Sequence, residues 1–274
     1  MKIIDLHVHS VFSDGTLTVR QIVQNARRRG ISVMSLTDHD TVDGWAPFRA
    51  LCRDSSIRPV PGIELSSKCD RTVHILGYRM ECFQPLEDAL SQVRSFRNQR
   101  NERMASRLQE LGLRVTVEDA LGASGGKIVA RPHFAKIMVE KGYVPDLQSA
   151  FSRYLARGAA AYVPRDGFSP AECVEIIRES KGLAVLAHPS LTGLDEGGLG
   201  ELLEELKSHG LWGLECVSSH CSPQESYKYL AIAGKHSLFP TAGSDFHGAN
   251  RPNAALGVQV SDDFLPWARI GVTL

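Results

Sequence analysis

The stretch Lys2-Ile3-Ile4-Asp5-Leu6-His7-Val8-His9 places two histidines directly after a short apolar run. The apolar run predicts a buried β-strand. Alternate side chains of a strand point to the same side, so His7 and His9 are expected to face one way. Two imidazoles held on one side of a strand end are well placed to bind a single metal ion.

Strand-like and helix-like segments alternate in the first and last thirds of the chain. Strands are predicted at 2–6, 31–36, 58–63, 72–78, 183–187, 211–217 and 238–242. Helices are predicted at 18–29, 43–54, 169–182, 198–209 and 223–236. This alternation predicts parallel β-α units, and the 274-residue length fits one α/β barrel of about 250 residues with an insertion. Residues 83–158 are charged, helix-like and poor in strands, so we expect an inserted helical subdomain there and a barrel made by 1–82 and 159–274.

Charge and composition limit the classes of partner. The formal net charge is zero, which argues against a surface for duplex DNA. The chain has no apolar run of the roughly 18 residues that a membrane span needs, and its first ten residues do not resemble a secretory signal. Six scattered cysteines without a CxxC pair favour reduced thiols in the cytoplasm. We therefore expect a cytoplasmic protein with no membrane, duplex DNA or obligate protein partner.

Histidine and carboxylate side chains gather at the predicted strand ends. In chain order they are His7, His9, Asp38, His39, Glu64, His74, His188, His220, Asp245 and His247. The C-terminal ends of parallel barrel strands form one face, so these side chains are expected to converge. Imidazole and carboxylate together suit manganese, zinc or iron. Cysteine thiolates, which are typical of structural zinc sites, do not occur at these ends.

Each of these residues also has an ordinary structural explanation. A single histidine at a strand end is more often a hydrogen-bonded core residue, and Asp38 or Asp245 could cap a helix. A cluster of this many buried imidazoles and carboxylates is costly without cations to pair with them. The combination therefore predicts a metal centre.

The motifs together resemble the PHP (polymerase and histidinol phosphatase) family. They are DLHVHS at 5–10, SDG at 13–15, TDHD at 37–40, GIE at 62–64, His74 before a Leu-Gly pair, AHP at 187–189 and GSDFH at 243–247. This resemblance implies a distorted (β/α)7 barrel with two to three divalent metal ions, manganese being favoured over zinc or iron. By matching motif, it implies three sets of ligands: His7, His9, Glu64 and Asp245; Glu64, His74 and His188; and Asp14, His39 and His247.

The insertion is similar to the family branch that includes 3′,5′-nucleoside bisphosphate phosphatases, some of which trim short RNA from the 5′ end. The similarity rests on RPHFA at 131–135 and AYVPR at 161–165. It implies a metal-dependent phosphoesterase acting on a nucleotide or short RNA. Arg131, His133 and Arg165 would then hold the non-reacting phosphate. Alternatively, Arg131 and His133 only cap a helix and Arg165 is a surface charge.

Two roles and three rival functions stay open. His220 either contacts the phosphate or leaving group, or supports a metal ligand, and Asp38 is expected to orient His39 or a neighbouring ligand. The rivals are a histidinol-phosphate phosphatase, a non-catalytic metal-binding module and a hydrolase of C–N bonds. Arg131 favours an anionic substrate over the first rival, and the full set of ligand residues argues against the second.

Overall fold

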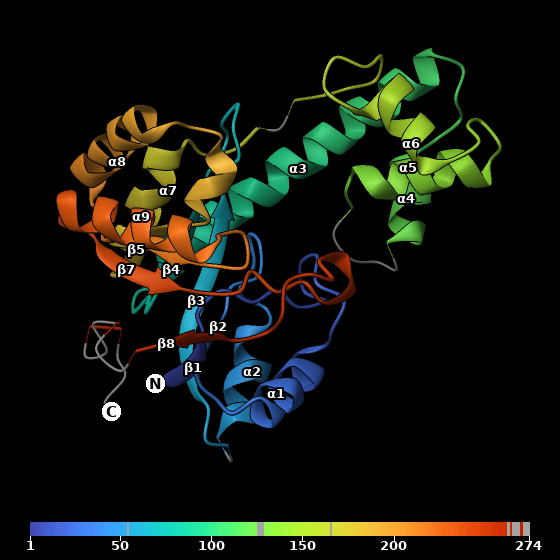
Figure 1. Cartoon of the computed structure of the whole chain (residues 1–274). Helices are drawn as coiled ribbons and strands as arrows, with labels where there is room; N and C mark the ends of the chain where they lie inside the picture. Colours follow the sequence, from blue (N-terminus) through green and yellow to red (C-terminus); the bar gives the residue numbers. More distant parts are fainter. Residues whose placement is uncertain (54, 125–128, 165, 262–263, 265–268, 271–274) are drawn as a thin grey trace. The chain divides into compact units, whose positions relative to one another are not determined.

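The computed structural model describes residues 1–274 apart from 54, 125–128, 165, 262–263, 265–268 and 271–274. Contacts divide the chain into two compact units, drawn in Figure 1. The first consists of Met1–Leu90 with Phe168–Leu274, and the second of Ser91–Gly167. Both boundaries fall later than the 83–158 expected from composition.

Within the described residues, the first unit contains one eight-stranded sheet in the order β7-β6-β5-β4-β3-β2-β1-β8 (Figure 1). The strands are β1 (Lys2–Asp5), β2 (Ile31–Leu36), β3 (Arg58–Ser66), β4 (His74–Tyr78), β5 (Leu183–Leu186), β6 (Gly213–Val217), β7 (Phe239–Ala242) and β8 (Val258–Val260). The Leu6 N–H donates to the Ala242 carbonyl at 3.2 Å, and Val8 bridges Phe246. The ends of β1 and β7 therefore meet, and the sheet nearly closes into a barrel.

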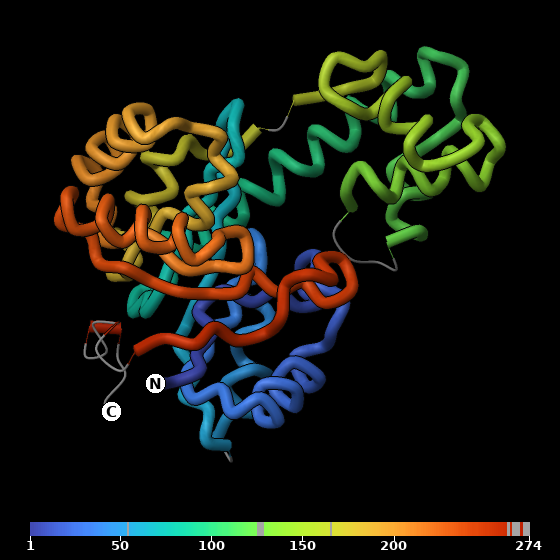
Figure 2. The backbone as a smooth tube through the Cα atoms, viewed as in Figure 1, coloured from blue at the N-terminus to red at the C-terminus, as the bar shows by residue number. Residues whose placement is uncertain are grey.

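Two strands depart from the all-parallel arrangement that the alternation predicted. β4 runs antiparallel to both β3 and β5, and β8 runs antiparallel to β1. Only residues 67–73 link β3 to β4, too few for a parallel crossover, which needs about a dozen. The prediction of parallel units is therefore wrong at β4, and β8 lies outside the strands that the sequence predicted. Figure 2 shows the first and last strands of the chain lying side by side.

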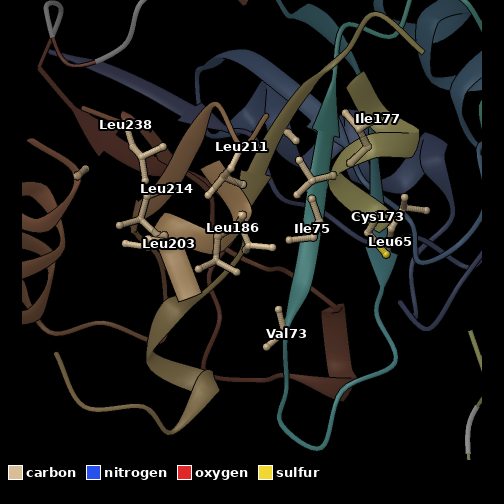
Figure 3. Packing of buried hydrophobic residues seen from close by; sticks show 14 of the residues in the cluster. Leu65, Val73, Ile75, Cys173, Ile177, Leu186, Leu203, Leu211, Leu214 and Leu238 are labelled. Atoms are coloured by element: carbon tan, nitrogen blue, oxygen red, sulfur yellow. The ribbon is translucent and has the colours of Figure 1, made fainter. Parts of the chain in front are cut away.

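Helices cover the outside of the barrel, and apolar side chains fill the space between. The helices of this unit are α1 (Val19–Arg28), α2 (Trp45–Cys52), α7 (Pro170–Glu179), α8 (Glu196–His209) and α9 (Pro223–Lys235). Figure 3 shows Ile75 and Leu186 of the sheet packed with Ile177 of α7 in one buried cluster. Helix starts follow local chemistry: the Thr18 hydroxyl accepts the Gln21 N–H in a capping box that begins α1.

The second unit is helical and has its own hydrophobic core. It contains most of α3 (Gln84–Glu110), then α4 (Val117–Ala123), α5 (Arg131–Glu140), α6 (Leu147–Ala150) and a π-helical turn at Phe151–Leu155. Leu108, Phe134 and Met138 are among its buried residues. The start of α3 instead belongs to the barrel unit, because Leu86 and Leu90 pack in the barrel core. In the part of the chain that the structure describes, no helix is long and apolar enough to cross a membrane.

Candidate metal centre

The nine ligand residues implied by the motifs come together at one end of the barrel. Most of them follow the C-terminal ends of parallel strands, as His7 follows β1 and His188 follows β5. His74 is instead the first residue of β4. Because β4 runs in the opposite direction, its first residue lies at the same end of the barrel as the last residues of its neighbours.

The first group of candidate ligands is fully buried. It consists of His7, His9, Glu64 and Asp245, whose ligand atoms all lie within 4.8 Å of one another. The Nε2 atoms of both histidines are 3.1 Å from Glu64 Oε2. They are also 3.4 and 3.3 Å from Asp245 Oδ1. Two imidazoles and two carboxylates thus surround one point.

The second group is built around Glu64. Its Oε1 atom lies 2.9 Å from His74 Nδ1 and 3.0 Å from His188 Nε2. Its Oε2 atom lies 3.2 Å from His39 Nδ1, and His39, Glu64 and His74 form a second compact set of ligand atoms. The two oxygens of Glu64 therefore face different sets of histidines, which is the geometry of a bridging carboxylate.

The third group is His9, Asp14, His39 and His247. His247 Nε2 is 3.2 Å from Asp14 Oδ1, and His9 Nδ1 is 3.7 Å from the same oxygen. His39 Nε2 is 3.9 Å from Asp14 Oδ2. His9 and His39 each present one ring nitrogen to this group and the other to a neighbouring group. The motifs had placed His9 only in the first set and His39 only in the third.

The donor set fits divalent metal ions. Several buried ligand atoms form no hydrogen bond in the described structure: His7 Nε2, both ring nitrogens of His9, Glu64 Oε2, Asp245 Oδ1 and His247 Nε2. They lie close together without the orientation that hydrogen bonds require. Buried polar atoms in such numbers are costly unless something pairs with them, and a cation is the partner that imidazole nitrogens and carboxylate oxygens share.

The charges of the cluster support this conclusion. Burial would raise the pKa of Glu64, but His39, His7 and His74 outweigh it and hold that pKa well below its usual value. Burial lowers the pKa of His39 and of His188, which favours the neutral imidazole that binds metals. His7 differs: against the effect of burial, Glu215 and Glu64 raise its pKa to about 10, so a metal must displace a proton there.

Glu215 supports the first group and was missed in the sequence. It lies in β6, is fully buried, and its Oε1 atom is 2.9 Å from His7 Nδ1. Its Oε2 atom accepts the His188 N–H at 2.7 Å. A carboxylate in the middle of the apolar run Gly213–Val217 must have a buried partner, and this was the signal that could have identified it.

Two further carboxylates hold the loops that carry ligands. Asp5 accepts hydrogen bonds from the Ser244 N–H at 2.8 Å and from the Gly257 N–H at 2.7 Å, which ties β1 to the loop of Asp245. Asp38 accepts from the Ser10 N–H and the Ser13 hydroxyl at 2.7 and 2.6 Å. Asp38 thus braces the loop that leads to Asp14, whereas the hydroxyl beside His39 Nδ1 is that of Ser66, at 3.2 Å.

His220 lies against a candidate ligand. Its Nε2 atom is 2.8 Å from Asp245 Oδ2, the oxygen that faces away from His7 and His9. Burial and the nearby Arg251 lower the pKa of His220, so the imidazole is neutral near pH 7. Of the two roles considered for His220, this contact matches support of a metal ligand.

The residues expected to hold the non-reacting phosphate belong to the second unit. His133 Nδ1 accepts the Ala130 N–H at 2.9 Å and so caps the start of α5. Arg131 donates through Nη1 to the Leu155 carbonyl at 3.4 Å, and its guanidinium lies 5.8 Å from the centre of the Tyr162 ring. Arg165 lies outside the described residues.

A nearly closed α/β barrel with a buried histidine–carboxylate cluster at one end defines a metal-dependent hydrolase. Residues 5–157 match the PHP domain model, and the chain belongs to the PHP family. It is 34% identical over 249 residues to the 5′-3′ exoribonuclease Rnm of Escherichia coli, covering 89% of this chain and 85% of that protein. It is 31% identical over 260 residues to a 3′,5′-nucleoside bisphosphate phosphatase of Chromobacterium violaceum, covering 94% and 91%.

A solved structure from the same bacterium, an amidohydrolase with bound sulfate and no metal, matches with a TM-score of 0.80 and 29% identity. The match covers 97% of this chain and 95% of that one. The family, fold and ligand cluster together make this protein a metal-dependent phosphoesterase.

Proposed function

We propose that this enzyme cleaves the P–O3′ bond of a nucleotide that carries a 5′-phosphate. In a nucleoside 3′,5′-bisphosphate, this cleavage releases inorganic phosphate. In short RNA with a 5′-phosphate, cleavage of the same bond releases the first nucleotide and leaves a new 5′-phosphate on the rest. One site can therefore perform both reactions named for its relatives, the exoribonuclease and the bisphosphate phosphatase.

The observation that carries the proposal is the set of three overlapping groups of ligand atoms at one end of the barrel. We propose two or three divalent ions here, with manganese as the native metal. When bound, such ions activate a water molecule and neutralise negative charge on a phosphoryl group. Glu64, with its two oxygens facing different histidines, would keep neighbouring ions at a fixed spacing.

The protein's own residues hold this arrangement rigid. Glu215 fixes the ring of His7, and Asp38 fixes the loop that carries Asp14. His220, neutral and in contact with Asp245, acts in this proposal as a positioning residue. Fixed ligands matter because catalysis by positioned charges loses its advantage if the site must reorganise during the reaction.

We propose Arg131 as the anchor for the phosphate that does not react. Only one of its guanidinium nitrogens has a hydrogen bond in the described structure, so the planar fork keeps donors for an anion. His133 acts indirectly, through the start of α5 that it caps, and Arg165 stays a proposed contact. The free cysteines of the chain suit a reducing compartment, and we place the enzyme in the cytoplasm.

Product analysis with three substrates tests the proposed function. The manganese-loaded protein is incubated with adenosine 3′,5′-bisphosphate, histidinol phosphate and a 5′-phosphorylated trinucleotide. We expect phosphate from the bisphosphate, mononucleotides from the trinucleotide and little reaction with histidinol phosphate. Turnover of histidinol phosphate alone would replace the proposal by the rival phosphatase. No reaction with any of the three would refute the proposed substrate class.

A further inference from the structure

The two oxygens of Asp245 face different surroundings. Oδ1 points toward the Nε2 atoms of His7 and His9 and forms part of the first ligand group. Oδ2 points away from that group and is contacted by His220 Nε2 at 2.8 Å and by Arg251 Nη1. Arg251 Nη1 also lies 2.9 Å from His220 Nε2. Arg251 therefore contacts the oxygen of Asp245 that does not belong to the first ligand group.

Arg251 is held in place by its own loop. It follows the 3-10 turn Gly248–Asn250, and its N–H donates to the Gly248 carbonyl at 3.2 Å. Within the same turn, Asn250 Nδ2 donates to the Asp14 carbonyl at 2.7 Å, and the Ala249 N–H donates to the Thr16 hydroxyl at 2.9 Å. The turn is thus fastened to the loop that carries another candidate ligand, Asp14, so the position of Arg251 is fixed from two sides.

The guanidinium of Arg251 has hydrogen-bond donors that its protein contacts do not use. Arginine carries five N–H donors in a planar fork. In the described residues, Arg251 forms its hydrogen bonds through Nη1, which leaves the donors of Nε and Nη2 without a partner. Its side chain is 33% exposed, while that of Asp245 is 1% exposed. Nη1 thus contacts the buried carboxylate, while Nε and Nη2 belong to a partly exposed side chain and keep donors for a ligand.

We propose that Arg251 is a phosphate-binding residue of the metal centre. Its free donors bind a non-bridging oxygen of the phosphate ester, beside the ions that Asp245 would hold, while Nη1 keeps its contact with Oδ2 of that carboxylate. An arginine fork matches the spacing of phosphate oxygens, and hydrogen bonds between opposite charges are the strong ones. This inference rests on the proposed function for the identity of the anion.

Inorganic phosphate, which this enzyme does not turn over, gives a test without catalysis. Phosphate binding to the manganese-loaded protein is measured by calorimetry for the wild type, Arg251→Gln and Arg251→Lys, together with bound metal per chain. We expect Arg251→Gln to weaken phosphate binding by on the order of 10-fold or more at unchanged metal content. Arg251→Lys, which keeps the charge and loses the fork, should weaken it less.

Arg178→Gln is the matched control. Arg178 is exposed in the last turn of α7, which leads into the end of β5 opposite His188, so phosphate binding should not change. If Arg251 only braces Asp245, Arg251→Gln will lose bound metal, and the chains that stay loaded will bind phosphate as tightly as the wild type. That outcome, or equal phosphate affinity in all variants, overturns the proposal. If Arg251→Gln does not fold, Arg251→Lys alone decides, because unchanged affinity there would also overturn it.

The phosphate-binding experiment and the substrate test can refute their two proposals independently. If phosphate binding depends on Arg251 but adenosine 3′,5′-bisphosphate is not hydrolysed, the proposed substrate is wrong and the anion site stands. If the bisphosphate is hydrolysed and phosphate affinity is unchanged in the Arg251 variants, the proposed substrate is supported and the role of Arg251 is refuted.

Discussion

Glu215 Oε1 lies 2.9 Å from Nδ1 of His7, and both side chains are completely buried. A carboxylate that accepts the second ring N–H of a metal-binding histidine fixes the tautomer and orientation of the ring. His7 Nε2, the atom on the other side of the ring, is the one that faces Glu64 and Asp245. We therefore expect metal binding at the first group to depend on Glu215, a residue outside the candidate ligands.

Glu215→Gln should weaken metal binding. The glutamine amide has one oxygen that accepts hydrogen bonds and an NH2 group that only donates. Either His7 Nδ1 or the His188 N–H therefore loses its acceptor. Loss of such a supporting partner typically costs about 10- to 100-fold in metal affinity. Equilibrium dialysis with Mn²⁺ measures the change. Glu175→Gln, which alters a surface Glu–His pair with His209, is the control; equal affinity in both variants would contradict this role.

Metal affinity should increase with pH. The pKa of His7 is raised from 6.5 to about 10, against burial, by Glu215 and Glu64. In the metal-free protein, protonated His7 contributes stability that is complete below pH 6.5 and is lost as the pH rises to about 10. A metal must displace that proton, so the apparent Kd for Mn²⁺ should fall by about tenfold per pH unit within this window. A Kd that does not change with pH would contradict the displacement of a proton from His7.

Gly243→Ala should disrupt the junction between β7 and β1. A Cβ at this position would lie 2.3 Å from His7 Cβ and 2.6 Å from His7 N, both far inside van der Waals contact. We expect a loss of about 2–3 kcal/mol in the free energy of unfolding, measured with urea, and weaker metal binding because His7 is displaced. Gly234→Ala, at an exposed position of α9 with open space around it, should instead be neutral or stabilising by up to about 1 kcal/mol. Similar effects of the two substitutions would contradict the close approach at Gly243.

Arg131→Ala should affect substrates with a second phosphate most strongly. If Arg131 holds the non-reacting phosphate, KM for adenosine 3′,5′-bisphosphate should rise by about 10-fold or more, and KM for a plain 3′-monophosphate should change little. Steady-state kinetics with both substrates gives the comparison. An equal loss on the two substrates would mean that Arg131 serves only the structure of α5.

The candidate ligands were predictable because their positions follow simple rules. Period-two spacing placed His7 and His9 on one side of the segment that follows β1, and strand ends indicated most of the others, whereas Asp14 was implied only by the family resemblance. The apolar run of β4 does not indicate whether the strand is parallel or antiparallel to its neighbours. Only the short link at 67–73 indicated the antiparallel direction.

The supporting residues were harder to predict. Glu215 sits in a run that otherwise looks like an ordinary buried strand, and Arg251 lies in a loop without periodicity. The sharing of His9 and His39 between groups depends on where both nitrogens of each ring point. Side-chain rotamers set that orientation, and the order of residues in a motif does not specify them.

Phosphate release from adenosine 3′,5′-bisphosphate as a function of bound manganese tests the central claim most directly. A metal-dependent phosphoesterase predicts no release from the metal-free protein, release that rises with the number of ions bound per chain, and loss of both in Asp245→Asn. Release that does not depend on bound metal would contradict this claim. A fully loaded wild-type protein that releases no phosphate would instead refute adenosine 3′,5′-bisphosphate as the substrate.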